Sequence, residues 1–152
     1  MARYGNSTSF VSIEVKGKDE ILALLRQLPE ELGVPVLKRA LLSASRLMLD
    51  EVKRRTPVEL VKRKPKGREG QLYQSMRSRY GRTDDKNVAK VLVGTKLWYA
   101  YYLEFGTVRM QPLHFMRDAF ESTKDEVADR FSVACGERVT KALNDYEVKR
   151  SL

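Results

Sequence analysis

The longest amphipathic pattern in this sequence, from Pro112 to about Tyr146, restricts the fold more than any other feature. Apolar residues recur there at three- and four-residue spacing, with charged residues between them. This is the period of an α-helix that buries one face, so the segment predicts a single long helix. Its first half is expected to lie across its own sheet. Its distal turns can extend beyond that core, and Val139 and Leu143 would then be buried by another subunit.

A second helical pattern runs from about Pro35 to Arg55 and predicts a central helix. Three basic residues occupy its last turn, where cations suit the helix dipole, and a Thr-Pro pair follows its end. A shorter helix is expected over residues 19–28, with Asp19 as its N-cap and the next proline as its stop.

Three shorter segments have the pattern of β-strands. Ser9–Lys16 alternates apolar and polar residues, as a half-buried strand does. Arg77–Tyr80 and Val88–Val93 are expected to pair as a hairpin, and Gly94 ends its second arm. Leu72–Met76, just before the hairpin, is ambiguous between a helical turn and the start of a strand.

At 152 residues the chain has the length of one domain. The patterns together predict an α+β fold in which a small antiparallel sheet packs against the central helix and the long C-terminal helix. We expect a single domain over residues 9–146, a flexible N-terminal arm at 1–8 and a C-terminal tail at 147–152. Residues 57–70 combine proline, glycine and many cations, so they are expected to form an exposed basic loop.

The composition excludes several classes of function. Cys135 and His114 are the only cysteine and the only histidine, so an internal disulfide and the usual Cys/His zinc site are both out of reach. His114 has no neighbouring nucleophile, and Cys135 falls on an apolar helical face. No apolar run could span a bilayer or serve as a signal peptide. We therefore expect a cytoplasmic protein with no cofactor, no metal and no catalytic residues, which is not an enzyme.

The net charge of +9 is concentrated between Lys53 and Arg82. That segment holds eleven basic and two acidic residues, so its net charge equals that of the whole chain. A concentrated positive surface favours an anionic partner, either nucleic acid or an acidic protein face. The candidate contacts in the loop are Lys62, Arg63, Lys64, Lys66 and Arg68. The same pattern also fits a solvated loop whose charges only keep the protein soluble.

The densest aromatic cluster covers residues 98–105 and has a carboxylate, Glu104, set into it. A short helix that ends at Gly106, a natural C′ residue, is the preferred interpretation. Glu104 is expected either to accept hydrogen bonds from Thr107, from nearby backbone N–H groups or from a following arginine, or to lie exposed at the helix end. No catalytic signature overlaps the cluster, so we interpret it as an internal hinge between the hairpin and the last helix.

Five short pieces follow one another in a fixed order along the chain. They are Thr56-Pro57-Val58, Gly70-Gln71-Leu72-Tyr73-Gln74-Ser75-Met76, Val93-Gly94, Tyr99-Ala100 with Glu104-Phe105-Gly106-Thr107, and Pro112 with Phe115-Met116 and Ala119. In this order the sequence resembles the family of tail-completion or head-tail joining proteins of long-tailed phages, commonly named after the gene-ten product of an HK-type lambdoid coliphage. The resemblance spans about residues 19–145. The segment between Pro57 and Gly70 is longer and more basic than the compact family pattern.

The resemblance implies a structural virion protein, with host cytoplasm as its location during assembly and the head-tail junction as its final one. It would be a ring-forming subunit, with six copies expected, around the DNA passage of the neck. Its implied partners are other copies of itself, neighbouring neck, tail-terminator or head-completion proteins, and packaged DNA without sequence specificity; no membrane is among them. The motif residues with an implied structural role are Tyr99, Glu104, Phe105, Gly106, Thr107, Pro112 and Phe115.

The alternative interpretation is a sequence-independent nucleic-acid-binding protein that uses the basic 53–82 segment. Tyr73 and Tyr80 lie among its arginines, where they could stack on bases. Against this, the arginines fall on two different kinds of element, and no recognition helix or familiar nucleic-acid motif is present.

Overall fold

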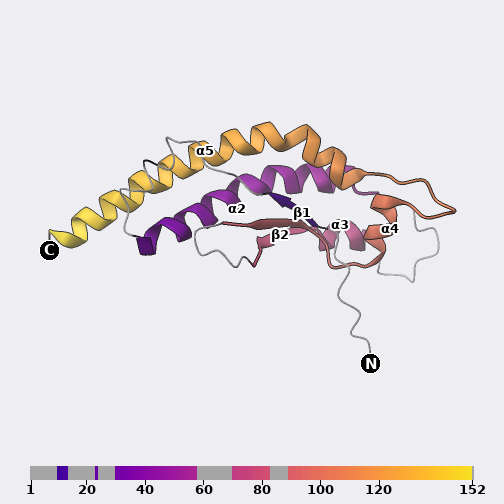
Figure 1. Ribbon diagram of the computed structural model, residues 1–152, viewed down its shortest axis with the longest axis horizontal. Helices are drawn as coiled ribbons and strands as arrows, with labels where there is room; N and C mark the ends of the chain where they lie inside the picture. The colour runs from indigo at the N-terminus through magenta and orange to yellow at the C-terminus, as the bar shows by residue number, and fades with distance from the viewer. Residues whose placement is uncertain (1–9, 14–22, 24–29, 58–69, 83–88, 152) are drawn as a thin grey trace, which may run out of the picture.

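A computed structural model describes residues 10–13, 23, 30–57, 70–82 and 89–151 of the chain. The helices are α2 (Glu30–Arg55), α3 (Gln71–Ser75), α4 (Tyr99–Phe105) and α5 (Phe115–Arg150), and the strands are β1 (Phe10–Ile13), β2 (Arg77–Tyr80) and β3 (Val91–Gly94). α2 and α5 run side by side in opposite directions along the molecule (Figure 1), with β2 and β3 against α2 and β1 in contact with α5. The expected α+β class, with a small antiparallel sheet against a central and a long C-terminal helix, is confirmed.

Several expected segments fall outside the described residues. They include the arm at 1–8, all but one residue of the expected 19–28 helix, and residues 58–69 of the basic loop. The five candidate contacts of that loop, from Lys62 to Arg68, therefore lie outside the described residues and stay predictions.

The core is formed mainly along the seam between α2 and α5. α2 buries side chains at helical spacing on one face, namely Ala40, Leu41, Ala44, Met48 and Val52. α5 contributes the facing set, which consists of Phe115, Met116, Ala119, Val127, Phe131, Cys135 and Val139. Each large apolar side chain contributes about 1.5–3 kcal/mol on full burial, so this seam is the main source of stability.

α2 begins at Glu30, five residues before the predicted start at Pro35, so that boundary was wrong. Pro35 instead lies inside the helix, near its N-terminal end. As the sixth helical residue it removes one backbone hydrogen bond, the one to the carbonyl of Glu31. The loss is tolerated because the burial that holds α2 begins beyond it, at Ala40. The predicted end of the helix, at Arg55, is confirmed.

The predicted boundaries of the last helix are also corrected. α5 starts at Phe115 rather than Pro112, because His114 has a left-handed backbone (φ 48°), which a right-handed helix cannot include. The N–H groups of Leu113 and His114 donate to carbonyls of α4. At the other end the helix continues to Arg150, past the predicted end at about Tyr146. Two basic residues in its last turn suit the helix dipole.

The expectation that Val139 needs a second subunit for burial was wrong. Its side chain is fully buried (0% exposed) within its own chain, and Leu143 is half-buried. Other apolar residues of α5 remain exposed instead, namely Val133, Tyr146 and Val148.

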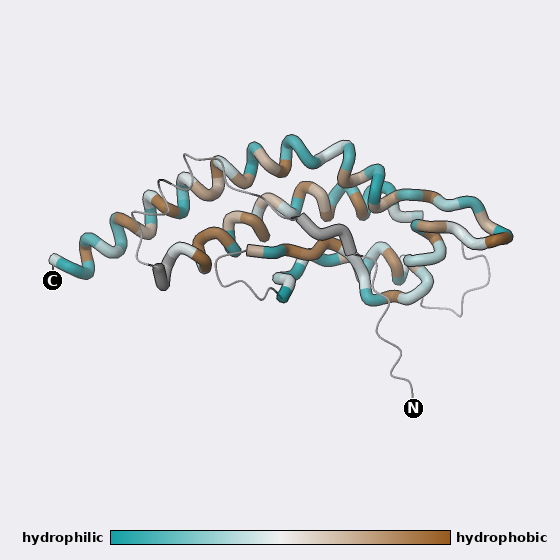
Figure 2. The backbone as a smooth tube through the Cα atoms, viewed as in Figure 1, coloured by the Kyte–Doolittle hydropathy of each residue, from teal (hydrophilic) through white to brown (hydrophobic). Residues whose placement is uncertain are grey.

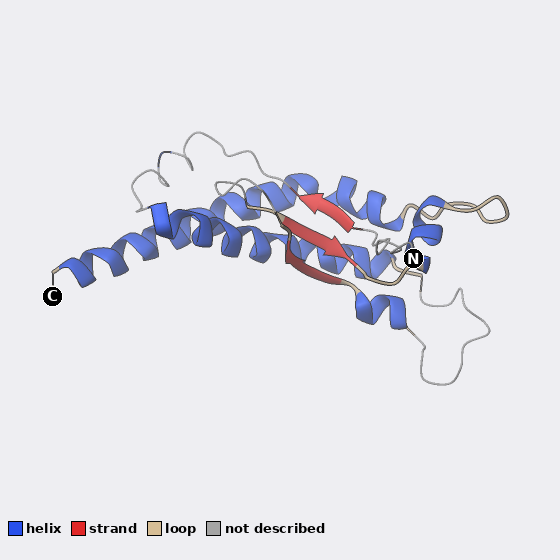
Figure 3. Ribbon diagram, turned by 60° about the horizontal axis from the view of Figure 1, so that its bottom comes forward, coloured by secondary structure: helices blue, strands red, loops and turns tan. Residues whose placement is uncertain are grey.

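The described strands form one antiparallel sheet in the order β1-β3-β2. The predicted β2–β3 hairpin is confirmed, although β3 begins three residues later than expected and includes Gly94, which pairs with Phe10 on one side and Arg77 on the other. Val91 and Val93 are fully buried on the face of β3 that contacts α2, whereas Leu92 points to the opposite face. Figure 3 shows the three strands side by side on one side of the helices.

Candidate functional site

Glu104, in the last turn of α4, has a buried carboxylate (4% exposed). Its two oxygens accept hydrogen bonds from the backbone N–H groups of Met116 and Arg117, each at 2.9 Å. These N–H groups belong to the second and third residues of α5, which a helix start leaves without partners. The negative charge also lies at the positive end of the helix dipole. Because His114, the local N-cap residue, makes no side-chain cap bond, α5 takes its cap from another helix.

The sequence left several hydrogen-bond donors to Glu104 possible, and in the structure the donors are backbone N–H groups. The Thr107 hydroxyl instead accepts from the N–H of Arg109 at 3.3 Å. A short helix ending at Gly106 was also expected, and α4 does end there: the Gly106 N–H donates to the carbonyl of Tyr102 at 2.8 Å.

The segment between α4 and α5 projects from one end of the molecule (Figure 1). Its base is closed by two backbone hydrogen bonds, from the Leu113 N–H to the Leu103 carbonyl (2.9 Å) and from the His114 N–H to the Glu104 carbonyl (3.3 Å). Gly106 begins the projection with φ 77° and ψ −177°, a conformation available almost only to glycine. The projection is therefore a hairpin held at its base rather than a free loop.

The hairpin ends in a two-residue tip, Val108 and Arg109. Thr107 and Met110 flank the tip and exchange backbone hydrogen bonds of 2.9 and 3.1 Å as an antiparallel bridge. Both tip residues are exposed, and Val108 is as open to solvent as in an extended peptide (107%). Figure 2 shows hydrophobic colouring at the outer end of the projection. An apolar side chain thus stands at the outermost position of the projection.

An exposed aromatic row lies beside the hairpin and consists of Trp98, the N-cap residue of α4, with Tyr101, Tyr102 and Phe105 of the helix itself. Trp98 is 66% and Phe105 60% exposed. The rings contact one another edge-on or tilted, with centroids 5.7 Å apart for Trp98 and Tyr102 and 4.8 Å apart for Tyr101 and Phe105. Their three- and four-residue spacing places them on one helical face. The interpretation of this segment as an internal hinge did not take that spacing into account.

The remaining motif residues are structural neighbours of this end. Phe115 is buried, Tyr99 and Pro112 are half-buried, and burial raises the pKa of the Tyr99 phenol. Ser75 Oγ and Thr95 Oγ1 share a hydrogen bond of 2.6 Å, so α3 is joined to the chain just after β3. Of the five short sequence pieces, the fourth and the fifth are joined directly by the hydrogen bond from the Met116 N–H to Glu104.

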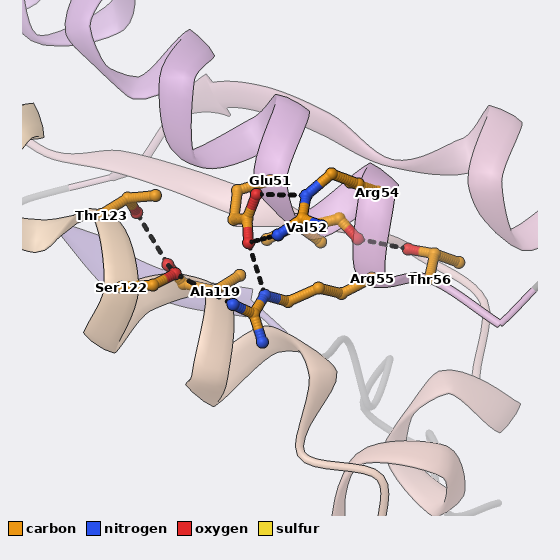
Figure 4. Close-up of polar contacts among 8 residues, drawn as sticks. All are labelled: Glu51, Val52, Arg54, Arg55, Thr56, Ala119, Ser122 and Thr123. Atoms are coloured by element: carbon orange, nitrogen blue, oxygen red, sulfur yellow. Dashed lines mark hydrogen bonds and ion pairs between the residues drawn. The ribbon is translucent and has the colours of Figure 1, made fainter.

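The basic end of α2 lies near the start of α5 (Figure 4). Glu51 binds Arg54 and Arg55 through carboxylate oxygens at 2.6 to 2.7 Å, and Arg55 also donates to Ser122 Oγ at 3.4 Å. The hydrogen bonds from Arg54 and Arg55 lower the pKa of Glu51 from 4.5 to about 2. Lys53 Nζ lies 5.5 Å from the ring centroid of Tyr73, within range of a cation–π contact.

Replacing Glu51 with Gln is expected to lower the free energy of unfolding at neutral pH by about 0.5–1 kcal/mol, a small value because solvent screens the pair. The folded-state pKa is depressed, so the contribution is complete above pH 4.5 and is lost as the pH falls toward about 2. Urea denaturation across that range measures the difference between wild type and variant. Asp50→Asn, at the exposed neighbouring position, is the control, and a difference that did not shrink with acid would contradict the assignment.

Within the described ranges the chain has neither a metal-binding cluster nor a membrane-spanning helix. No group of three or more His, Cys, Asp or Glu side chains there is placed to hold a metal ion. Among the described helices, none has the length and apolar character needed to cross a membrane. Cys135 is buried, and burial raises the pKa of its thiol, the opposite of what activates a cysteine nucleophile.

Comparison with known protein families shows the family to which the chain belongs. The model of the HK97-gp10-like family, described as a bacteriophage tail component, matches residues 19–106, which is more than half of the chain. The chain belongs to this family. No curated protein sequence and no solved structure gave a significant match. The HK97-gp10-like match contains α2, the hairpin strands and α4 with Glu104, and it ends at Gly106, before the projecting tip and α5. Membership places the protein in a family of phage tail components.

Proposed function

We propose that this protein acts in head-tail joining or tail completion at the neck of a long-tailed phage, as a non-enzymatic subunit of a ring around the DNA passage. Membership in the HK97-gp10-like family supports the tail assignment. The main structural support for the neck role is the end of the molecule where the aromatic row and the hairpin tip lie together. Exposed apolar groups gathered in one place on a folded protein mark an interaction surface, and a rigid hairpin beside them suits docking to neighbouring subunits.

The proposed partners are other copies of this chain and the adjacent neck, tail-terminator or head-completion proteins. Packaged DNA would pass near the basic end of α2, where Lys53, Arg54 and Arg55 form the last turn. Glu51 offsets part of the charge of the two arginines, so Lys53 is the cation of that turn with most of its charge available to a phosphate.

Deletion of the gene in the phage or prophage that carries it tests the proposal. The expected result is an accumulation of separate filled heads and separate tails, visible by electron microscopy, with infectivity restored by the gene in trans. Complete but non-infectious particles would contradict a joining role.

Sequence-independent nucleic-acid binding remains the second candidate, favoured by the Lys53–Tyr73 pair, which combines a cation with a stacking surface. Duplex affinity should then fall steeply with increasing salt, because each neutralised phosphate releases counterions. Retained particle assembly by a chain that binds no duplex at low salt would exclude this candidate.

A further inference from the structure

A shallow groove of about 380 Å³ lies between α2 and α5, away from the hairpin. Its floor is apolar, with Ala44 from α2 and Val133 and Ala134 from α5. Val133 is 63% exposed, so this floor is open to solvent. We call this depression the helix groove.

The rim of the helix groove is acidic. Glu126, Asp129 and Glu137 line it, against a single cation, Arg130. Arg130 Nε lies 3.8 Å from Glu126 Oε1 and offsets the charge of that carboxylate. Asp129 and Glu137 have no ion-pair partner among the described residues. The groove therefore offers an apolar floor beside two uncompensated carboxylates.

The hairpin tip has the complementary chemistry. Val108 presents a fully exposed apolar side chain, and Arg109 presents an exposed guanidinium with no acidic partner in the described part of the chain. Val108 and Arg109 are neighbours in the tip, and the apolar floor and the acidic rim are likewise neighbours in the helix groove. An arginine also matches carboxylates in geometry, because its fork of donors can bind both oxygens.

We propose that the tip of one copy docks into the helix groove of the next copy. Val108 covers the floor at Val133, and Arg109 pairs with Asp129 and Glu137. This inference rests on the proposed ring and assigns its subunit contact. A second copy is the favoured occupant because both complementary surfaces occur on the same chain.

The contact is heterologous, since it joins two unlike surfaces. The tip stands at one end of the molecule and the groove lies along the middle of the helix pair, far from it (Figure 1). Each copy that donates its tip still offers an empty groove, so the contact repeats from copy to copy. Repetition closes into a ring when the rotation per subunit allows it.

Cysteine cross-linking tests the contact. Val108→Cys and Val133→Cys are combined in a chain whose native thiol is removed by Cys135→Ala, and the full-length protein is oxidised both in solution and in purified particles. The expected result on a non-reducing gel is a ladder of covalent multimers that ends at the ring size. Each single cysteine variant should give no ladder.

A charge exchange tests the polar half of the contact. Arg109→Glu is expected to weaken self-association by about tenfold or more, because a like charge then faces the rim. Adding Asp129→Arg in the same chain should restore association, whereas Lys141→Glu, an equal charge change on the exposed surface of α5, should leave it unchanged. Sedimentation velocity over a range of protein concentrations measures each variant.

The outcomes separate this inference from the function on which it rests. Wild-type protein that assembles, without a ladder from the double cysteine variant and without an effect of Arg109→Glu, would overturn the tip-groove contact and leave the ring in place. Dimers from Val108→Cys alone would overturn it as well, in favour of a tip-to-tip contact. Wild-type protein that does not assemble in solution, together with a double cysteine variant that gives no ladder in particles, would overturn both.

Discussion

Gly106→Ala is expected to lower the free energy of unfolding by about 3 kcal/mol. Its φ of 77° with ψ of −177° is strained for any residue with a Cβ. A Cβ there would also stand 2.7 Å from the carbonyl oxygen of Met110 and 2.9 Å from the nitrogen of Pro112. Both are backbone atoms, which cannot rotate away as a flexible side chain would. Urea denaturation of the purified protein measures the loss.

The chain provides a matched control for this substitution. Gly136 lies inside α5, and a Cβ built there meets no atom within 4 Å. Gly136→Ala should therefore raise stability by about 0.5–1 kcal/mol, because alanine loses less backbone entropy than glycine in a helix. Equal stability of the two alanine variants would contradict the constraint at Gly106.

Glu104→Gln is expected to destabilise the protein by about 1–3 kcal/mol. The buried carboxylate accepts from the N–H groups of both Met116 and Arg117, and an amide can offer an oxygen to only one of them. Its NH₂ group would face the other donor, and the favourable charge at the start of α5 would be lost.

Glu121→Gln serves as the control for Glu104. Its carboxylate is exposed and pairs with Lys124 three residues on, so the cost should stay within about 0.5 kcal/mol. Hydrogen exchange gives a second readout, because the amides of Met116 and Arg117 should exchange faster in Glu104→Gln than in wild type. Unchanged stability together with unchanged exchange would contradict the capping role.

The sequence predicted those features whose causes are local. The three- and four-residue spacing of apolar side chains identified α2 and α5, and alternation with a polar turn identified the β2–β3 hairpin. The end of α4 at Gly106 followed from the preference of glycine for that position.

The errors arose where distant contacts override local rules. Pro35 was predicted to begin α2, but burial along the rest of the helix stabilises a helix that already begins at Glu30. Pro112 was predicted to begin α5, but the junction with α4 holds His114 in a left-handed conformation, so the helix starts at Phe115.

The candidate site was only partly accessible from sequence. The identity of the donors to Glu104 depends on how α4 meets α5, and no spacing rule specifies that angle. The helix groove depends on which side of α5 the packing of α2 leaves open, so its carboxylates could not be grouped before the fold was known.

The closed base of the hairpin reduces the conformational entropy that is lost when a partner binds the tip. Because the cap at Glu104 and the backbone bonds of Leu113 and His114 hold the hairpin, its conformational freedom is lost during folding. A partner that binds the tip then has no segment to order, which leaves more of the contact free energy for affinity. Loosening the base should therefore weaken binding at the tip even when Val108 and Arg109 are intact.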